Sequence, residues 1–268
     1  MPIHPTAIVE DGAEIGAGAE IGPFCFVESG VKLGEGVRLI SHVVIHSGTE
    51  IGARTIVHPQ AVLGGDGQIR KADPTGTRLV VGADCVLREC VTLNRGSQKG
   101  GGITTIGERC YIMAYSHFGH DCHVGNDVTV ANGAAVGGHV TIGDGVIIGG
   151  IAAIQQFGRV GKYAFVGGLS GINEDVIPYG VAFGDHAQLA GLNLIGLKRR
   201  GVPRANIHAL RAAYRVIFQS DEGHIADRAK RAGENFAEFP EVQDVVRFIL
   251  ADAKQAICTA RKRGQDDE

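Results

Sequence analysis

The feature that most constrains the fold of this chain is an aliphatic residue that returns every six positions. The first run comprises Ile3, Val9, Ile15, Ile21, Val27, Leu33, Leu39, Ile45, Ile51, Val57 and Leu63. Four positions after each of them comes a small residue, most often Ala, Val, Thr or Cys. An α-helix repeats about every 3.6 residues and a strand about every two, so a period of six indicates a coil that turns a corner in each repeat. Three repeats, or roughly 18 residues, would complete one turn, and successive turns would stack at about 4.8 Å as paired strands do.

The repeat is interrupted twice before it ends. It resumes after each gap, the second time one residue out of step at Ile106, and it stops after Ile172. Residues 69–80 and 99–105 are therefore predicted to form loops that project from the coil. The aliphatic column would fill the interior of a three-sided prism, and the small column would sit where the corners leave no room for bulk.

The spacing of apolar residues becomes helical beyond residue 180. Apolar residues three and four positions apart, with Pro203 suited to a first helical turn, predict a helical region. The predicted helices span residues 203–219, 223–235 and 240 to about 261. We therefore predict two domains, a β-solenoid over residues 1–180 and a small α-helical domain over residues 181–268.

Composition agrees with a coil rich in corners and limits the function. Glycine accounts for 41 of the 268 residues and tryptophan is absent, which suits corners better than a globular core. A net charge of -3 argues against nucleic-acid binding. Because the sequence has no long apolar run and no signal-peptide pattern, we expect a cytoplasmic protein without a transmembrane segment. Cys25, Cys85, Cys110 and Cys122 fall in the small column, so we interpret them as space-filling residues rather than disulfide or metal-binding ones.

A block of polar residues at 115–125, YSHFGHDCHVG, is not explained by the repeat. The period of 18 places Gly138 beside His120 and His139 beside Asp121 on the next turn of the coil. A further 18 residues reach the turn after that. The predicted cluster on this edge of the prism comprises His120, Asp121, Gly138, His139, Gln155 and Gln156.

Two chemistries suit this cluster, whereas a purely structural or surface-binding solenoid would not need it. In acyl transfer, His120 would be the general base, Asp121 would orient it, and the Gly138 amide would face the oxyanion. The alternative is a zinc hydratase of the γ-carbonic-anhydrase type, since His117, His120 and His123 have the spacing H-x-x-H-x-x-H. Zinc ligands must converge on bonds of about 2.0 Å. Because His117 and His123 lie one hexad apart on different faces, we predict no metal unless ligands come from two subunits.

Several motifs together resemble the UDP-N-acetylglucosamine 3-O-acyltransferases that open lipid A biosynthesis. They are HFGHDCHVG at 117–125, GGH at 137–139, IIGG at 147–150, Gln156-Phe157, VGGLSG at 166–171 and GLKRRG at 196–201. Hexads alone are shared by many acyltransferases, but GLKRRG within a C-terminal helical domain is specific. The related N-acyltransferases carry an additional N-terminal domain, which we do not expect here.

The resemblance implies an all-β solenoid of the left-handed parallel β-helix type, followed by the helical domain. It also implies a homotrimer with sites between neighbouring coils. His120 is implied as general base at the sugar 3-position, with Asp121 to orient it and the Gly138 amide as oxyanion donor. The implied substrate-binding residues are Lys71, His117, His139, Gln156, Gly168, His186, Asn193, Arg199 and Arg200. Among them, Lys71 would reach the acceptor sugar or its phosphates, and Gly168 would lie in the acyl groove.

The implied donor is a 3-hydroxyacyl thioester on the phosphopantetheine of acyl carrier protein, with no other cofactor. The acceptor is a UDP-sugar. Acyl carrier protein is acidic, so exposed basic residues are candidates for its docking surface. These candidates are Arg159, Lys162, Arg204, Arg211 and Arg215.

Three positions depart from the pattern of the family. Asn94 stands where a histidine is common, Gln155 stands where a histidine commonly precedes Gln-Phe, and Ile195 replaces a common acidic residue. His120 is unaffected, so acyl transfer is not in question, but the recognition of the acceptor is. A 3-amino UDP-sugar acceptor, and hence N-acyl transfer, remains an alternative to the 3-hydroxyl sugar.

Overall fold

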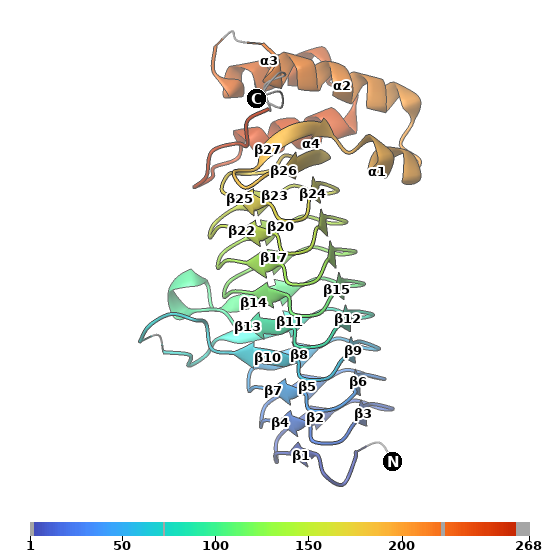
Figure 1. Ribbon diagram of the computed structural model, residues 1–268, viewed down its shortest axis with the longest axis vertical. Coiled ribbons are helices and arrows are strands. Elements are labelled where there is room, and N and C mark those ends of the chain that lie inside the picture. The colour runs from blue at the N-terminus through green and yellow to red at the C-terminus, as the bar shows by residue number, and fades with distance from the viewer. Residues whose placement is uncertain (1–2, 72, 221–222, 261–268) are drawn as a thin grey trace.

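The chain forms a tall three-sided prism capped by helices (Figure 1). The computed structural model describes residues 3–71, 73–220 and 223–260. Within these residues the strands make three sheets of nine, eight and ten strands, in which each strand pairs in parallel with the strand one turn away, apart from a terminal hairpin. The fold is a left-handed parallel β-helix followed by helices, as the family resemblance implies.

The three sheets form the three faces of the prism. The first sheet contains β1 (Ile8–Val9), β4 (Phe26–Val27), β7 (Val44–Ile45), β10 (Val62–Gly65), β13 (Thr92–Asn94), β16 (His117–Phe118), β19 (Ala135–Val136), β22 (Ala153–Ile154) and β25 (Gly171–Ile172). The second contains β2 (Glu14–Ile15), β5 (Lys32–Leu33), β8 (Thr49–Ile51), β11 (Arg78–Val81), β14 (Ile103–Ile106), β17 (His123–Val124), β20 (Thr141–Ile142) and β23 (Arg159–Val160). The third contains β3 (Glu20–Ile21), β6 (Arg38–Leu39), β9 (Ile56–Val57), β12 (Val86–Leu87), β15 (Tyr111–Ile112), β18 (Thr129–Val130), β21 (Ile147–Ile148), β24 (Phe165–Val166), β26 (Gly180–Phe183) and β27 (Gln188–Leu192).

The aliphatic column fills the interior of the prism. Val27, Leu63, Ile148 and Phe118 are fully buried, and Phe118 is the largest of the fully buried side chains in the described residues. Hydrogen bonds between turns satisfy the backbone, as from Gly119 N to the carbonyl of the next turn at 2.8 Å. Each two-residue strand pairs with a strand on the turn above and with one on the turn below, and both pairings together stabilise it.

The corners of the coil depend on a left-handed backbone conformation. Asp121, His139 and Phe157 have φ angles of 57°, 62° and 65°. Such angles cost L-residues roughly 1–2 kcal/mol each. The amides of His139 and Phe157 nevertheless find partners on the turn below, in bonds of 2.8 Å to the His120 carbonyl and 3.0 Å to the Gly138 carbonyl. Stacking thus holds corner residues in a conformation that they would avoid in isolation.

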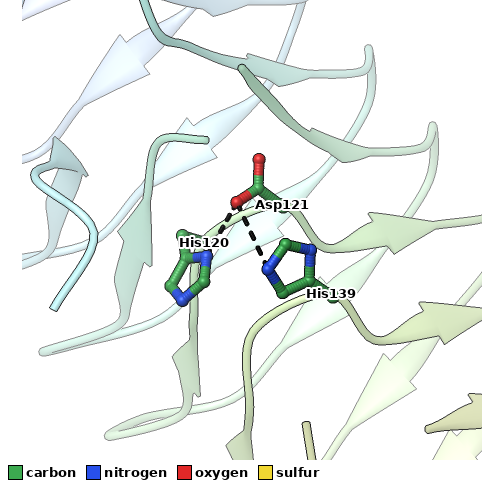
Figure 2. Close-up of side chains that lie close together, drawn as sticks. All are labelled: His120, Asp121 and His139. Carbon is green, nitrogen blue, oxygen red and sulfur yellow. Dashed lines mark hydrogen bonds and ion pairs between the residues drawn. The ribbon is translucent and has the colours of Figure 1, made fainter. Parts of the chain in front are cut away.

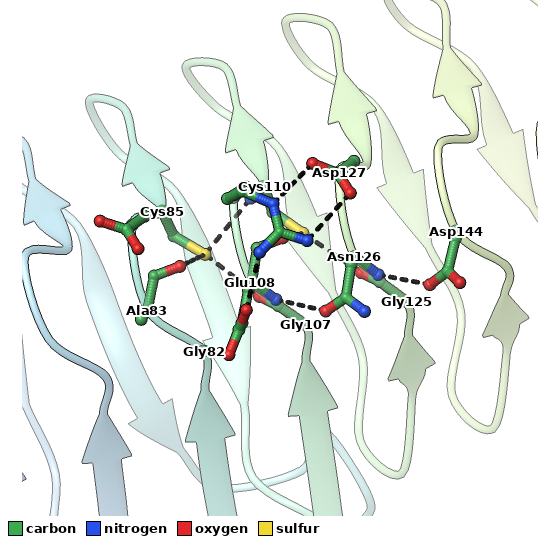
Figure 3. A network of polar contacts seen from close by, with 12 residues as sticks. Gly82, Ala83, Cys85, Gly107, Glu108, Cys110, Gly125, Asn126, Asp127 and Asp144 are labelled. Carbon is green, nitrogen blue, oxygen red and sulfur yellow. Dashed lines mark hydrogen bonds and ion pairs between the residues drawn. The ribbon is translucent and has the colours of Figure 1, made fainter. Parts of the chain in front are cut away.

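One corner column shows how side chains complete this stacking (Figure 3). The Asn126 side chain accepts a hydrogen bond from Glu108 N at 2.8 Å, and Asp144 accepts one from Asn126 N at 2.7 Å. Inside the same corner the Cys85 thiol donates to the Gly107 carbonyl at 3.1 Å. All six cysteines fall within the described residues and are free, and the four of the small column, Cys25, Cys85, Cys110 and Cys122, are buried as a space-filling role requires.

Two insertions leave the coil next to each other, one between β10 and β11 and one between β13 and β14 (Figure 1). The second contains the short 3₁₀ helix η1 (Gln98–Gly100), and Gln98 donates to the Thr75 carbonyl of the first at 3.1 Å. Both returning strands begin earlier than expected, at Arg78 and Ile103. They do so because these two residues pair with each other and extend the second sheet.

The helices lie at the C-terminal end of the prism (Figure 1). They are α1 (Leu194–Arg199), α2 (Arg204–Phe218), α3 (Ile225–Asn235) and α4 (Pro240–Leu250). Below them, β26 continues the third sheet on β24 and then pairs antiparallel with β27. None of the helices in the described part of the chain is long and apolar enough to cross a membrane.

The last helix is shorter than predicted, since the prediction extended it to about residue 261. Arg261 itself lies outside the described residues. The helix α4 ends at Leu250, and Ala251 has extended backbone angles. The chain then returns to the coil, where Ile257 pairs with Asp175 and Ala260 with Leu189. Backbone pairing with the coil replaces helical hydrogen bonds, which the periodicity of apolar residues does not reveal.

Candidate active site

The predicted histidine cluster exists and lies at the corner that follows β16, β19 and β22 (Figure 2). We call this column the histidine edge. It consists of the corner pairs His120–Asp121, Gly138–His139 and Gln156–Phe157 on three successive turns. His120 is buried and its Nδ1 lies 2.7 Å from Asp121 Oδ2. The period of 18 residues therefore stacks His120, Gly138 and Gln156 as predicted, whereas Gln155 precedes its corner pair, is exposed and does not line the cleft described below.

Asp121 is the most deeply buried member of the cluster, with 1% of its surface exposed. Its Oδ1 accepts a hydrogen bond from Ser97 N at 2.9 Å, and its Oδ2 accepts one from Ser97 Oγ at 2.6 Å. Burial by itself would raise the pKa of Asp121, but the hydrogen bonds from Ser97 and His120 outweigh burial and hold that pKa below its ordinary value. Asp121 is thus a carboxylate at neutral pH, and His120 Nδ1 carries the proton that it donates to Oδ2.

His139 forms the second wall of the cluster. Its ring lies edge-on to His120 at 4.9 Å between centroids and stacks on Phe157 at 4.4 Å. On the other face of Phe157, Lys254 Nζ lies 3.8 Å from the ring centroid. Burial lowers the pKa of His139, an effect that the charge of Asp121 opposes. His139 is accordingly neutral at pH 7 and does not compete with His120 as a charged partner of Asp121.

A cleft of about 320 Å³ opens beside His120. It is lined by Gln68, His117, Gly119, His120, Ala135, Val136, Gly137, Gly138, Ala153, Ile154 and Gln156. Gly138 is required by space, because a β-carbon there would lie 2.6 Å from His120 Nε2. His117 is half-buried with Nδ1 2.7 Å from Thr92 Oγ1, and burial lowers its pKa.

The backbone of Gly138 lines this cleft. On the neighbouring corner column, the equivalent amides of Glu108 and Asn126 are satisfied by side chains of the next turn. The Gly138 amide has no such acceptor among the hydrogen bonds of the described residues. An imidazole and a backbone amide without an acceptor in the described chain therefore lie at one cleft, and acyl transfer calls for two such groups.

His120, Asp121 and His139 are also close enough to be considered as metal ligands, since their donor atoms lie within 4.8 Å of one another. The contact of 2.7 Å between His120 Nδ1 and Asp121 Oδ2 is, however, shorter than the roughly 3.3 Å that separates two ligands of a tetrahedral zinc ion. Both Asp121 oxygens also accept hydrogen bonds from Ser97. The geometry fits a hydrogen-bonded dyad better than a metal site.

The proposed zinc triad of the alternative hypothesis is not assembled. His117 belongs to β16 on the first sheet, whereas His123 belongs to β17 on the second sheet and is bound to Thr105. The two side chains therefore stand on different faces of the prism, as the hexad spacing predicts.

The structure does not bring the remaining predicted residues to this cleft within one chain. His186 contacts Asn173 at 3.3 Å, and Lys71 is exposed on the first insertion. Asn193 caps α1 through Gly196 N at 2.9 Å. Arg199 is exposed at the end of α1.

Arg200 and Gly168 lie at the other two corner columns. The guanidinium of Arg200 lies 3.8 Å above the Tyr163 ring and donates to the Gly145 carbonyl. Gly168 is exposed beside Leu169. In one chain, the predicted binding residues are thus spread over three edges of the prism.

Sequence reasoning missed Ser97, Gln68 and Gly67 as members of the site. Gly67 packs so closely on His120 that a β-carbon there would lie 3.0 Å from His120 Cβ. The register of the aliphatic column could have indicated the position of Ser97. It pairs Leu93 with Phe118, which places residues 95 and 96 below His120 and Asp121. The loop that follows would then be expected at the histidine edge.

The departures from the family pattern have distinct surroundings. Asn94 is buried and donates to the carbonyls of Gly65 and Asp66 at 3.2 and 2.8 Å, which ties down the base of the first insertion. Gln155 is exposed, and Ile195 is 66% exposed on α1. Asn94 therefore has a structural role, whereas Ile195 presents an apolar surface to solvent.

Comparison with known proteins identifies the family. Residues 103–138 match the bacterial transferase hexapeptide model, and residues 175–258 match the second domain of UDP-N-acetylglucosamine O-acyltransferase. An acyl-[acyl-carrier-protein]–UDP-N-acetylglucosamine O-acyltransferase of Bartonella henselae is 46% identical over 98% of this chain and 95% of its own length. The corresponding protein of Brucella ovis is 48% identical over 96% of this chain and 92% of its own. The chain belongs to the UDP-N-acetylglucosamine O-acyltransferase family.

Solved structures of this acyltransferase family agree with the assignment. The UDP-N-acetylglucosamine acyltransferase from Campylobacter jejuni superposes with a TM-score of 0.91 at 34% identity, over 97% of this chain and all of that one. The enzyme LpxA of Acinetobacter baumannii superposes with the same score and identity, over 97% of this chain and 100% of its own. The likeness thus includes the acyltransferase coil and the C-terminal helices together.

Proposed function

We propose that this protein transfers a 3-hydroxyacyl group from acyl carrier protein to the 3-hydroxyl of the sugar of UDP-N-acetylglucosamine, the first step of lipid A biosynthesis. The observation that carries the proposal is the arrangement of His120 against Gly138 at one cleft, with Asp121 behind the imidazole. The names of the relatives supply the substrates.

His120 would act first as a base. Its Nδ1 proton is held by Asp121, so the Nε2 lone pair faces the cleft and accepts the proton of the sugar hydroxyl. The sugar oxygen attacks the thioester carbonyl carbon, and the resulting oxyanion accepts a hydrogen bond from the Gly138 amide. When the carbon–sulfur bond breaks, the thiolate of phosphopantetheine takes the proton back from His120. Asp121 stabilises the imidazolium between these two steps.

The nucleotide would be held by the cationic and polar residues that the family pattern assigns. Arg199 is exposed and free to form a bidentate contact with a diphosphate, and Lys71 on the first insertion supplies a second positive charge. Arg200, His186 and Asn193 complete the proposed set. His117, His139 and Gln156 would line the sugar end of the site.

A homotrimer would assemble these residues, and an apolar column on the surface supports it. Tyr115, Ile151 and Leu169 lie on one corner column, with Gly133 between Tyr115 and Ile151, and are 70%, 67% and 74% exposed. We call this column the apolar edge. Large exposed apolar side chains in a row indicate a surface that another protein covers. A neighbouring coil packed there would bring Gly168 of one copy close to the histidine edge of the next. The six free cysteines suit the reducing cytoplasm, which we propose as the location.

The first test replaces His120 by Ala and measures acyl transfer from 3-hydroxyacyl-acyl carrier protein to UDP-N-acetylglucosamine. We expect kcat to fall by about 10²–10⁴, which is the usual contribution of a general base. The matched control is His123→Ala, since His123 is three residues away but exposed on another face. Near-normal turnover by His120→Ala would overturn the mechanism.

A second test addresses the acceptor. The purified wild-type enzyme is offered 3-hydroxyl and 3-amino UDP-sugars with acyl chains of graded length. We expect the 3-hydroxyl sugar to be preferred, since the relatives are named O-acyltransferases. A preference for the amine would replace O-acyl transfer by N-acyl transfer at the same site.

A further inference from the structure

We propose that Ser97 is a positioning residue of the active site, which selects His120 rather than His139 as the hydrogen-bond partner of Asp121. The inference rests on the proposed acyl transfer and adds a residue to its machinery. Ser97 begins the second insertion and is buried, with 6% of its surface exposed. It is the residue at which this insertion meets the histidine edge.

Asp121 has two imidazole neighbours, and the distances to them differ. Its Oδ2 lies 2.7 Å from His120 Nδ1 and 3.9 Å from His139 Nε2 (Figure 2). A rotation of the carboxylate about χ2 would exchange these partners, because terminal sp² torsions are broad. Something other than the Asp121 backbone must therefore hold the carboxylate toward His120.

Ser97 donates a hydrogen bond to each oxygen of this carboxylate. Its backbone N–H donates to Oδ1 at 2.9 Å and its hydroxyl donates to Oδ2 at 2.6 Å. The hydroxyl shares Oδ2 with His120, so two donors converge on one oxygen from different sides. Two bonds to two oxygens determine the plane of the carboxylate, which a single bond does not.

Ser97 is itself fixed by the insertion that it begins. Its carbonyl accepts hydrogen bonds from Gly100 N and Gly102 N, both at 2.9 Å, and these close the loop into a compact turn. Gly100 lies directly over the cluster, where a β-carbon would collide with Asp121 and with the His139 ring. The insertion therefore covers the carboxylate and excludes water, which strengthens the hydrogen bonds beneath it.

The consequence concerns the tautomer of His120. With Oδ2 held toward His120, the imidazole keeps its proton on Nδ1 and presents the Nε2 lone pair to the cleft. Without the Ser97 hydroxyl, one oxygen loses a donor and the carboxylate gains freedom to turn toward His139. A fraction of His120 would then adopt the other tautomer, which has no lone pair on Nε2 and cannot act as base.

The experiment compares Ser97→Ala with Ser97→Thr, which restores a hydroxyl at the same position. We expect Ser97→Ala to lower kcat by about 10–100-fold, the usual effect of removing a group that orients a functional residue, with KM nearly unchanged. Ser97→Thr should recover most of the loss. The matched control is Gln98→Ala, which removes contacts between the two insertions but none to Asp121.

Two further measurements separate positioning from a merely structural role. In a background of Asp121→Asn, the Ser97→Ala change should cost less than twofold, because it acts through that carboxylate. The ¹⁵N shifts of the His120 ring should report the Nδ1–H tautomer in the wild type and a mixture in Ser97→Ala, without substrate. An unchanged kcat, an equal loss in both backgrounds, or an unchanged tautomer would each overturn the inference. The ¹⁵N ring shifts need no turnover, so they test the role of Ser97 independently of activity. If the wild-type enzyme acylates neither acceptor, that result overturns the proposed function and not the inference about Ser97.

Discussion

Two edges of the same prism have the same backbone and opposite chemistry. On the histidine edge, the left-handed corner residues of three successive turns are Asp121, His139 and Phe157. On the apolar edge, Tyr115, Ile151 and Leu169 occupy the equivalent left-handed positions. On the histidine edge Asp121 is hydrogen-bonded to His120 and His139 stacks on Phe157, while the side chains of the apolar edge project into solvent. A repeating fold therefore supplies equivalent backbone positions, and the residues that occupy them decide whether a column becomes a buried polar cluster or an exposed apolar edge.

The difference between the edges arises from what lies over each of them. Both insertions project beside the histidine edge, where Gly67 and Ser97 contact His120 and Asp121. These contacts convert exposed corners into a buried polar cluster. On the apolar edge, no segment of the described chain covers Ile151 or Leu169, so burial there requires another subunit.

The largest loss of activity is expected when a side chain is added at Gly138 on the histidine edge. Gly138→Ala places a methyl group about where the His120 ring lies, because the β-carbon would be 2.6 Å from Nε2. The base would be displaced from the attacking hydroxyl, and a misplacement of this kind lowers kcat/KM by about 100-fold or more. Steady-state kinetics with both substrates measures the loss.

The control for that substitution comes from the apolar edge. Gly150 occupies the equivalent first corner position, and a β-carbon there would lie 3.3 Å from the Asn132 carbonyl oxygen, a tight contact that is nevertheless longer than the 2.6 Å at Gly138. Gly150→Ala should keep activity within a few-fold of wild type. If the two alanine variants behave alike, the special role of the His120–Gly138 contact is refuted.

An intermediate effect is expected when the apolar edge is made polar. The double substitution Ile151→Asp and Leu169→Asp places charges within the proposed interface, and unpaired charges oppose its burial. We expect the trimer to dissociate and activity to fall with it, as measured by light scattering alongside turnover. Ile195→Asp is the matched control, since Ile195 is similarly exposed on α1. A charged double variant that remains trimeric and active would show that the partner binds elsewhere.

The smallest effect concerns pH and stability. Burial lowers the pKa of His117 and His139 in the folded chain, whereas unfolded histidine protonates near a pKa of about 6.5. The stabilisation from keeping them neutral is complete above that pKa and is lost as the pH falls below it, because the unfolded chain then binds more protons. Lowering the pH from 8 to 5.5 should therefore destabilise the wild type.

His117→Gln should reduce this acid sensitivity, changing the difference in Tm between the two pH values by about 1–3 °C. Thermal unfolding followed by circular dichroism provides the measurement. An identical difference in Tm for variant and wild type would contradict the assignment to His117. The contribution of Asp121 falls outside this window, because its lowered pKa keeps it ionised throughout.

Much of the fold and part of the site followed from the six-residue period of the aliphatic residues. The period of six predicted the prism, and its multiple of 18 stacked His120, Gly138 and Gln156, all of which line one cleft. The register of the coil brings the second insertion to the histidine edge, but the contacts of Gly67 and Ser97 did not follow, because residues within an insertion have no period from which to count. The end of α4 was also missed, since residues beyond Leu250 return to the coil through backbone pairing that apolar spacing does not encode.

The sequence by itself determined the family, the coil and the column in which the polar residues stand, because each of these depends on spacing along the chain. Tertiary structure decided how the column works. Asp121 is held toward His120 by Ser97 from 24 positions earlier, and the Gly138 amide is left without an acceptor in the described chain. The physical reason is that hydrogen bonds and excluded volume act over a few ångströms in space, whatever the separation of the residues in sequence.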